Sequence, residues 1–83
     1  MHDMSSQENK QIASRVARNI RIARGGQSQR EFAKALDVDP TYVSRWERGL
    51  VMPTYSRIES LAKTTERPVE WFFADNSSEQ VAA

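Results

Sequence analysis

Apolar residues recur along this chain at three- and four-residue spacing, which is the period of an amphipathic helix. No stretch alternates between apolar and polar residues in the manner of a half-buried strand. The first stripe consists of Ile12, Val16, Ile20 and Ala23. It predicts a helix over residues 7–24 that begins after Ser5 or Ser6 and is ended by the glycine pair at 25–26.

A second helix is predicted directly after this glycine pair. Ser28 and Glu31 have the spacing of a capping box, in which each side chain bonds the other residue's backbone N–H. The apolar face that follows consists of Phe32, Ala33 and Leu36. This helix is barely two turns long and is expected to end near Leu36 or Asp37.

A third helix is marked by signals at both ends. Asp39 is a suitable N-cap, Pro40 fits the first helical turn, and Gly49 is a natural C-terminal stop. Val43 and Trp46 lie three residues apart and are expected to face the core. The opposite face is polar or basic and consists of Thr41, Ser44, Arg45 and Arg48. A short helix with these two faces is suited to the major groove of DNA, and two short helices joined by about three residues form the skeleton of a helix-turn-helix.

Two more helices complete the predicted fold. Pro53 and Thr54 mark the start of the fourth, whose apolar stripe is Ile58, Leu61, Ala62 and Thr65. Pro68 opens a short fifth helix over residues 69–73. We therefore expect an all-α fold of five helices around one core, with a helix-turn-helix domain at residues 7–74 between flexible tails at 1–6 and 75–83.

Charge is distributed unevenly along the chain. The 83 residues have a formal net charge of only +1. Residues 10–48, however, hold nine basic and four acidic side chains, whereas residues 49–83 hold three basic and five acidic ones. Nine of the twelve cations are arginine, which binds phosphate and guanine in bidentate fashion. This asymmetry fits a domain that binds a polyanion on one side, although the same arginines could simply solvate a helix face.

Several classes of protein are disfavoured by the composition. The chain has no cysteine, its single histidine is His2 in the predicted tail, and it has no glycine-rich phosphate loop. We therefore expect neither catalysis nor a metal or cofactor. Neither an apolar run long enough to span a bilayer nor a secretory signal is visible, so we expect no membrane association and a cytoplasmic protein located on operator DNA in the nucleoid.

The motifs resemble the Cro/CI-repressor-type (XRE-like) helix-turn-helix family of bacterial and phage transcription regulators. The resemblance is carried by the following segments: S-Q-R-E-F-A-K-A-L at 28–36, V-x-x-x-Y-V-S-R-W-E-R-G at 38–49, Pro53, L-A-K at 61–63 and P-V-E-W-F-F at 68–73. It covers about residues 12–74. The resemblance implies a five-helix domain whose second and third helices bind double-stranded DNA, usually as a homodimer on an inverted repeat.

The resemblance also implies roles for single residues. The glutamine of the second helix, Gln29, usually contacts a phosphate and braces the start of the recognition helix. The base-reading positions map to Pro40, Thr41 and Arg45, with Ser44 nearby. Pro40 departs from the family pattern because it has no side-chain donor, so base reading is expected to shift to the other three. Asp37 stands where a glycine often makes the turn, and an aspartate tolerates the left-handed conformation there at some cost.

The chemistry of these side chains suggests how they would act. Arg45 can donate two hydrogen bonds to guanine, although a surface ion pair with Glu31 or Glu47 is the alternative. The candidates for contacts to the DNA backbone are Gln29, Tyr42, Arg48, Arg24 and Thr54. Tyr42 could instead pack its ring on the core. We expect Glu47 to brace the fold through a basic neighbour or a backbone N–H.

The fifth helix suggests an interface between subunits. At 100° per residue, Val69, Phe72 and Phe73 share one face and Trp71 lies nearly opposite. Because so short a helix cannot easily bury both faces, we expect Trp71 and Phe72 to contact a second subunit, unless the first helix covers Trp71. An antitoxin or protein-interaction module, with DNA binding secondary, is the alternative function.

Overall fold

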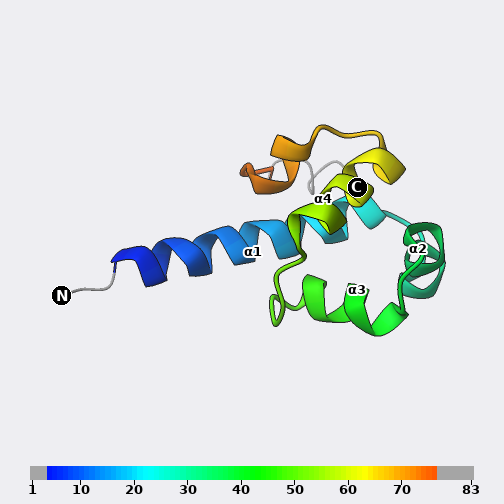
Figure 1. The fold of residues 1–83 in the computed structure, drawn as a ribbon, viewed down its shortest axis with the longest axis horizontal. Coiled ribbons are helices and arrows are strands. Elements are labelled where there is room, and N and C mark those ends of the chain that lie inside the picture. Colours follow the sequence, from blue (N-terminus) through cyan, green and yellow to red (C-terminus); the bar gives the residue numbers. More distant parts are fainter. Residues whose placement is uncertain (1–3, 77–83) are drawn as a thin grey trace.

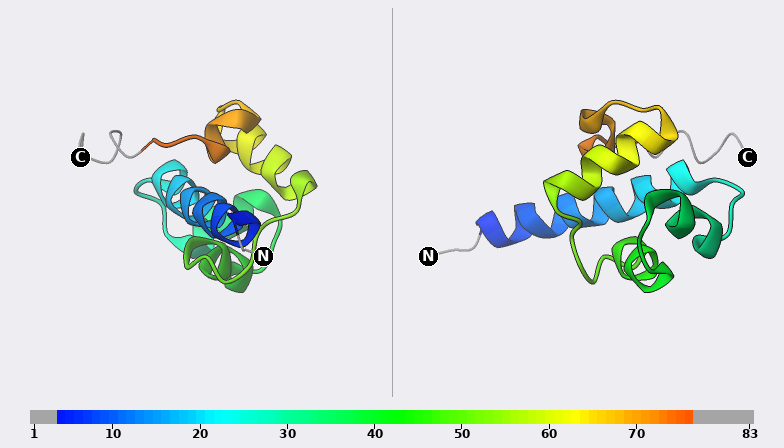
Figure 2. Two further views of the ribbon diagram at one scale, coloured as in Figure 1. Left: turned by 90° about the vertical axis from the view of Figure 1, so that its left-hand side faces the viewer. Right: turned by 45° about the vertical axis from the view of Figure 1, so that its right-hand side comes forward.

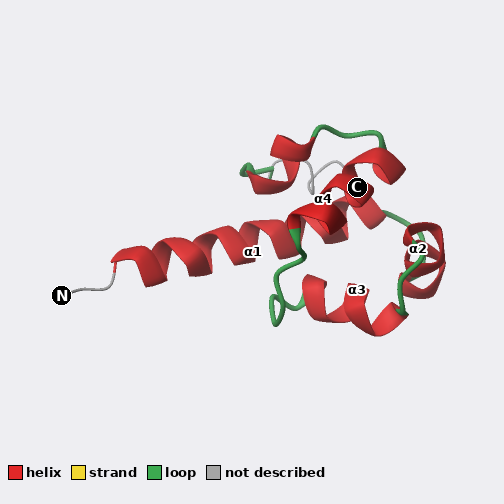
Figure 3. Cartoon of the chain, viewed as in Figure 1, coloured by secondary structure: helices red, strands yellow, loops and turns green. Residues whose placement is uncertain are grey.

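The computed structural model describes residues 4–76 of the chain. Its elements are α1 (Met4–Arg24), α2 (Gln29–Leu36), α3 (Pro40–Glu47), α4 (Tyr55–Thr65) and a short 3₁₀ helix, η1 (Val69–Phe73). Figure 3 shows that the described residues are helical throughout, apart from the connecting loops. The predicted all-α class is therefore confirmed. The outer parts of the two predicted tails, residues 1–3 and 77–83, lie outside the described residues.

Local capping signals explain where the central helices begin and end. The Ser28 Oγ accepts from the Glu31 N–H at 3.0 Å, and the Ser28 N–H donates to the Glu31 carboxylate at 3.1 Å, so the predicted capping box is confirmed. Asp37 ends α2 in the left-handed conformation, with φ 60°. The Val38 N–H then donates to the Ala33 carbonyl, which completes a Schellman motif. The helix-turn-helix is thus specified largely by its own sequence.

Helix α1 packs against α3 in one layer and against η1 and α4 in the other (Figure 2). Helix α2 connects the two layers, because it packs against both α3 and α4. The first turns of α1 extend beyond the other helices, as Figure 1 shows. The core between these layers consists of Val16, Ile20, Phe32, Ala33, Leu36, Val43, Trp46, Ile58, Leu61, Ala62 and Phe72. Every helix contributes to this single core, which fixes the position of α3 relative to the rest of the domain.

Two predictions about the first helix need correction. The helix begins at Met4 and not at Gln7, so Ser5 and Ser6 lie inside it and do not cap it. Ile12, the first residue of the predicted apolar stripe, is 36% exposed because it lies where α1 leaves the core. The later part of the stripe, Val16 and Ile20, is buried as predicted.

The predicted fifth α-helix is wrong in type. Residues 69–73 form a 3₁₀ helix, so the described chain has four α-helices and not five. In a 3₁₀ helix, side chains three apart are eclipsed, and the faces expected at 100° per residue do not apply. Phe72 is fully buried, while Val69, Trp71 and Phe73 are half-buried against the core. The short segment therefore packs all four side chains against its own domain.

Asn19 tethers this 3₁₀ segment to α1. Its side chain is completely buried, and the amide Nδ2 lies within hydrogen-bond distance of three backbone carbonyls, those of Phe72 and Ala74 at 2.8 Å and that of Trp71 at 3.2 Å. A buried donor at this point helps to satisfy the backbone carbonyls of the irregular turn, of which that of Trp71 also accepts from Asn76 at 2.7 Å. This contact is the main feature of the fold that the sequence analysis missed.

Within the described range, no helix has the length and apolar character needed to cross a bilayer.

Candidate nucleic-acid interface

Helix α3 presents a polar and basic face to solvent. Thr41, Arg45 and Arg48 are exposed, and Ser44 is half-buried between them. The Arg45 guanidinium forms no hydrogen bond or ion pair with any residue that the structure describes, so the ion pairs considered for it with Glu31 and Glu47 are not formed. This leaves its fork of N–H donors available to a ligand.

The opposite face of α3 is held in the core. Val43 is fully buried and Trp46 is 3% exposed, as predicted from their spacing. Tyr42 lies at the edge between the two faces: its ring is 6.3 Å from that of Trp46, centroid to centroid, yet the residue is 50% exposed. The polar and basic face therefore belongs to a helix that cannot rotate without disrupting the core.

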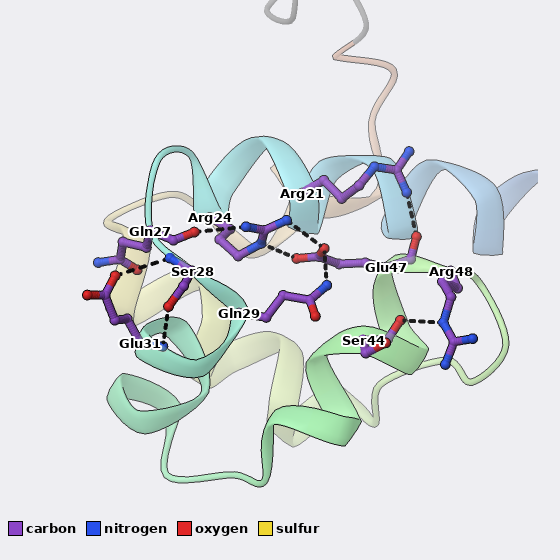
Figure 4. A network of polar contacts seen from close by, with 9 residues as sticks. All are labelled: Arg21, Arg24, Gln27, Ser28, Gln29, Glu31, Ser44, Glu47 and Arg48. Atoms are coloured by element: carbon purple, nitrogen blue, oxygen red, sulfur yellow. Dashed lines mark hydrogen bonds and ion pairs between the residues drawn. The ribbon is translucent and has the colours of Figure 1, made fainter.

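A buried carboxylate fixes the last turn of α3 (Figure 4). Glu47 is 4% exposed, and its two oxygens accept from Nε and Nη2 of Arg24 at 2.7 and 3.0 Å. Oε1 also accepts from the Gln29 amide at 2.9 Å. Such paired, charge-assisted bonds favour one orientation of the groups that they join. The prediction that Glu47 braces the fold through a basic neighbour is confirmed.

The network draws on three helices. Arg24 lies at the end of α1, Gln29 at the start of α2 and Glu47 at the end of α3. The hydrogen bonds from Arg24 to Glu47 raise the pKa of the guanidinium, although its partial burial acts against this. Arg24 also donates to the Gln27 carbonyl at 2.8 Å, which ties the loop between α1 and α2 to the same point.

Arg21 provides a further contact to the end of α3, which the sequence analysis did not identify. Its guanidinium donates to the backbone carbonyl of Glu47. The last carbonyls of a helix lack intrahelical partners and carry the negative end of the helix dipole, so a cation is favourable there. The three-residue spacing of Arg21 and Arg24, which places both on one face of α1, was the available signal.

The first turn of α3 lies beside a shallow hollow. Asp39 caps the helix, and its Oδ1 accepts from the Thr41 N–H at 2.8 Å. This hydrogen bond is the main reason why the pKa of the Asp39 carboxyl lies below its ordinary value, and the charge of Arg45 adds to the effect. The hollow has a volume of about 280 Å³ and is lined by Asp39, Thr41, Tyr42 and Arg45.

The residues predicted to contact the DNA backbone lie in different surroundings. Arg48 and Thr54 are exposed. Arg48 Nε is 3.4 Å from the Ser44 carbonyl, and the Thr54 hydroxyl caps α4 by accepting from the Arg57 N–H at 3.3 Å. By contrast, Gln29 and Arg24 are half-buried and engaged by Glu47. Gln29 thus braces the last turn of α3 and not its start, which corrects the expectation from the resemblance, because its amide bonds the Glu47 carboxylate. A phosphate contact by Gln29 or Arg24 stays a prediction.

The predicted subunit interface needs partial correction. Phe72 is fully buried in its own domain and offers no surface to a partner. Trp71 is half-buried, with the Arg67 guanidinium 4.0 Å from the centre of its ring. The more exposed apolar side chains lie after α3 and at the start of α4, where Leu50 is 65% exposed and Tyr55 is 62% exposed. Val51 and Met52, both 43% exposed, extend this surface.

Comparison with known proteins agrees with this geometry. The helix-turn-helix family model matches residues 18–72, which run from the middle of α1 to η1. The chain belongs to the helix-turn-helix family. Its fold and matched segment make it an XRE-like helix-turn-helix protein of the DNA-binding class. Helices α2 and α3 lie within the matched segment and form its helix-turn-helix.

A solved structure shares the arrangement of the helices. The chain is similar to the crystal structure of hypothetical transcription factor NHTF from Neisseria, with 27% sequence identity and a TM-score of 0.74. The match covers 87% of this chain and 85% of that one. No curated protein matches the chain.

Across the described residues, no group of three or more histidine, cysteine, aspartate or glutamate side chains is placed to hold a metal ion.

Proposed function

We propose that this helix-turn-helix protein is a transcriptional regulator that binds double-stranded DNA sequence-specifically, as a homodimer on an inverted repeat. The observation that carries the proposal is the division of α3 into two faces. One face is locked by Val43, Trp46 and Glu47, and the other exposes Thr41 and Arg45 to solvent. A rigid helix with an exposed polar face is what reading base edges in the major groove requires.

Within this proposal, Arg45 reads the sequence most strongly. Its free guanidinium can donate to O6 and N7 of guanine, a contact worth about 1–3 kcal/mol of discrimination. Thr41 can offer its methyl group to thymine or its hydroxyl to a base edge, and Ser44 lets the backbone approach closely. Arg48, Tyr42 and Thr54 surround this surface and position the domain on phosphates.

Arg24 has a different role in the proposal from the one expected from sequence. Its bonds to Glu47 make it a positioning residue for α3, and its exposed edge is a secondary phosphate contact at most. Gln29 acts in the same way, through the bond from its amide to Glu47. The proposed function needs no catalytic group and no cofactor.

We further propose that the protein represses transcription or controls an operon, by occupying its operator. The similarity to a hypothetical transcription factor from Neisseria supports a regulatory role. An inverted repeat contacted by two copies would place the two α3 helices about one turn of DNA apart, roughly 34 Å.

The homodimer needs an apolar contact surface. We place it on residues 50–55, where Leu50, Val51, Met52 and Tyr55 are exposed directly after the recognition helix. Burying a side chain such as Leu50 contributes about 1.5–3 kcal/mol. In sedimentation, the Leu50→Glu variant is expected to be monomeric where the wild type is dimeric, whereas Trp71→Ala is expected to stay dimeric. The reverse result would place the interface at Trp71, as the sequence suggested.

Selection of binding sites from a random duplex pool, at near-physiological salt, tests the proposed function. We expect enrichment of an inverted repeat whose half-sites lie about one helical turn apart. If the protein retains duplexes without enriching any sequence, and this retention weakens as salt is raised, the proposal is contradicted. In that case the exposed apolar segment at residues 50–55 would favour the alternative, a module that binds a partner protein such as a toxin.

A further inference from the structure

Asp39 places a negative charge on the face that is proposed to meet DNA. It immediately precedes α3, is exposed, and lines the hollow shared with Thr41, Tyr42 and Arg45. The bonds from Thr41 lower its pKa, so the carboxyl group is ionised at neutral pH. A fixed carboxylate on a surface that approaches phosphates is unfavourable unless it accepts a hydrogen bond from the ligand.

The cap leaves part of this carboxylate available. Oδ1 is engaged by the Thr41 N–H at 2.8 Å, which fixes the side chain against the helix end. The Thr41 side chain also hydrogen-bonds this carboxylate. A carboxylate has about four acceptor sites on its two oxygens, so it can still accept from a partner outside the protein. Pro40, the next residue, has no side-chain donor, so Asp39 and Thr41 supply the polar side chains at this end of α3.

The major groove presents few donors to such an acceptor. Only the exocyclic amino groups of cytosine, N4, and adenine, N6, donate there, whereas guanine and thymine present the acceptors O6 and O4. Adenine also presents the acceptor N7 beside its amino group, which repels a carboxylate. Cytosine has a C–H at the neighbouring position, so a carboxylate selects it over the other three bases.

Resting on the proposed function, we infer that Asp39 is a specificity-determining residue that accepts a hydrogen bond from the N4 amino group of a cytosine in each half-site. In this inference, Arg45 donates hydrogen bonds to guanine, whereas Asp39 accepts one from cytosine. The N-cap of α3 therefore recognises a base donor, and its last turn recognises base acceptors. The negative charge of Asp39 has a second effect, because it rejects guanine and thymine at the same position.

The Asp39→Asn variant tests this inference without removing the cap. Asparagine is as good an N-cap as aspartate, so its amide oxygen keeps the bond to the Thr41 N–H. The outward atom then becomes an NH₂ donor where the wild type has an acceptor. The Asp39→Ser variant is a matched control, since serine also caps the helix but does not reach a base edge. Thermal unfolding close to that of the wild type confirms that both variants are folded.

The measurement is the affinity of each protein for the selected site with all four base pairs placed in turn at every half-site position. At one position, the wild type is expected to prefer cytosine by about 5- to 150-fold. There the Asp39→Asn variant is expected to prefer guanine or thymine, and the Asp39→Ser variant to discriminate little.

Two results would overturn the inference. If Asp39→Asn keeps the base preferences of the wild type at every position, Asp39 does not read a base, although sequence-specific binding by both proteins would still uphold the proposed function. A preference of the wild type for adenine where the variants lose discrimination would refute the assignment to cytosine. Failure of the wild type to select any sequence would overturn the proposed function itself, and the inference with it.

Discussion

Asn19 shows how much one buried side chain contributes to this small domain. Its amide lies 2.8 Å from the carbonyls of Phe72 and Ala74, and 3.2 Å from that of Trp71, which also accepts from Asn76 at 2.7 Å. Asn19→Ala leaves these carbonyls without that donor, and a buried polar group without its partner costs about 1–3 kcal/mol. We expect urea denaturation to show a loss of that size in the free energy of unfolding.

Ser14→Ala provides the control for this prediction, because Ser14 is an exposed residue on the same helix. Substitutions at such positions usually change the free energy of unfolding by no more than about 0.5 kcal/mol. An Asn19→Ala effect as small as that of the control would contradict the role assigned to Asn19.

At the residue scale, sequence reasoning found the groups whose role depends on neighbours along the chain. Asp37, Asp39 and Ser28 were identified because their partners lie within five residues, at helix ends. Asn19 was missed because its partners lie more than fifty residues away, and an asparagine is usually exposed. The bond from Arg21 to the end of α3 was missed for the same reason of distance.

Helix ends offer a second test, at the scale of one element. Glu66 ends α4 in the left-handed conformation, with φ 59°, which is unfavourable for a residue with a Cβ atom. Glu66→Gly is expected to raise the free energy of unfolding by about 1 kcal/mol. Glu59→Gly, an exposed substitution inside the same helix, is expected to lower it by about 1 kcal/mol. Thermal unfolding of both variants tests the expectation, and equal effects would contradict it.

The hydrogen bonds of Arg24 and Gln29 to Glu47 join α1, α2 and α3. Their contribution to the free energy of unfolding can be measured. Glu47→Gln removes the charge that Arg24 faces, and breaking a buried pair from one side costs about 3–5 kcal/mol. Because the Arg24 side chain is 22% exposed, we expect the lower end of this range. A double-mutant cycle with Arg24→Gln should show coupling between the two residues. Additive effects would mean that the pair does not orient α3.

At the element scale, prediction succeeded for the helix-turn-helix and failed for the last segment. Helices α2 and α3 have caps, apolar spacing and turn residues that all indicate the same bounds. For residues 69–73, the choice between α and 3₁₀ conformation depends on packing against α1 and on the bonds from Asn19. The five residues of this segment contain no local signal for those contacts. The predicted helix faces were therefore wrong, and Phe72 was assigned to an interface between subunits.

Helix α1 is central to the whole molecule, since α3 packs against one side of it and η1 and α4 pack against the other (Figure 1). Its C-terminal end supplies both arginines that hold the last turn of α3. The basic side chains of residues 10–48 therefore have two roles: some bind Glu47 within the protein, and others face solvent, where they can contact DNA. A count of charges along the sequence cannot distinguish these roles, because the difference between Arg24 and Arg45 depends on which side chain contacts Glu47.

Arg45 is proposed to read bases, whereas Arg48 is proposed only to position the domain on phosphates. Affinities of the wild type, Arg45→Ala and Arg48→Ala for the selected operator and for a scrambled duplex distinguish these two roles. Arg45→Ala is expected to weaken operator binding by about 5- to 150-fold more than it weakens binding to the scrambled duplex.

Arg48→Ala is expected to weaken binding to both duplexes alike, and to reduce the salt slope by about 1. If Arg45→Ala instead lowers both affinities equally, or changes neither affinity, α3 does not read the DNA sequence through Arg45.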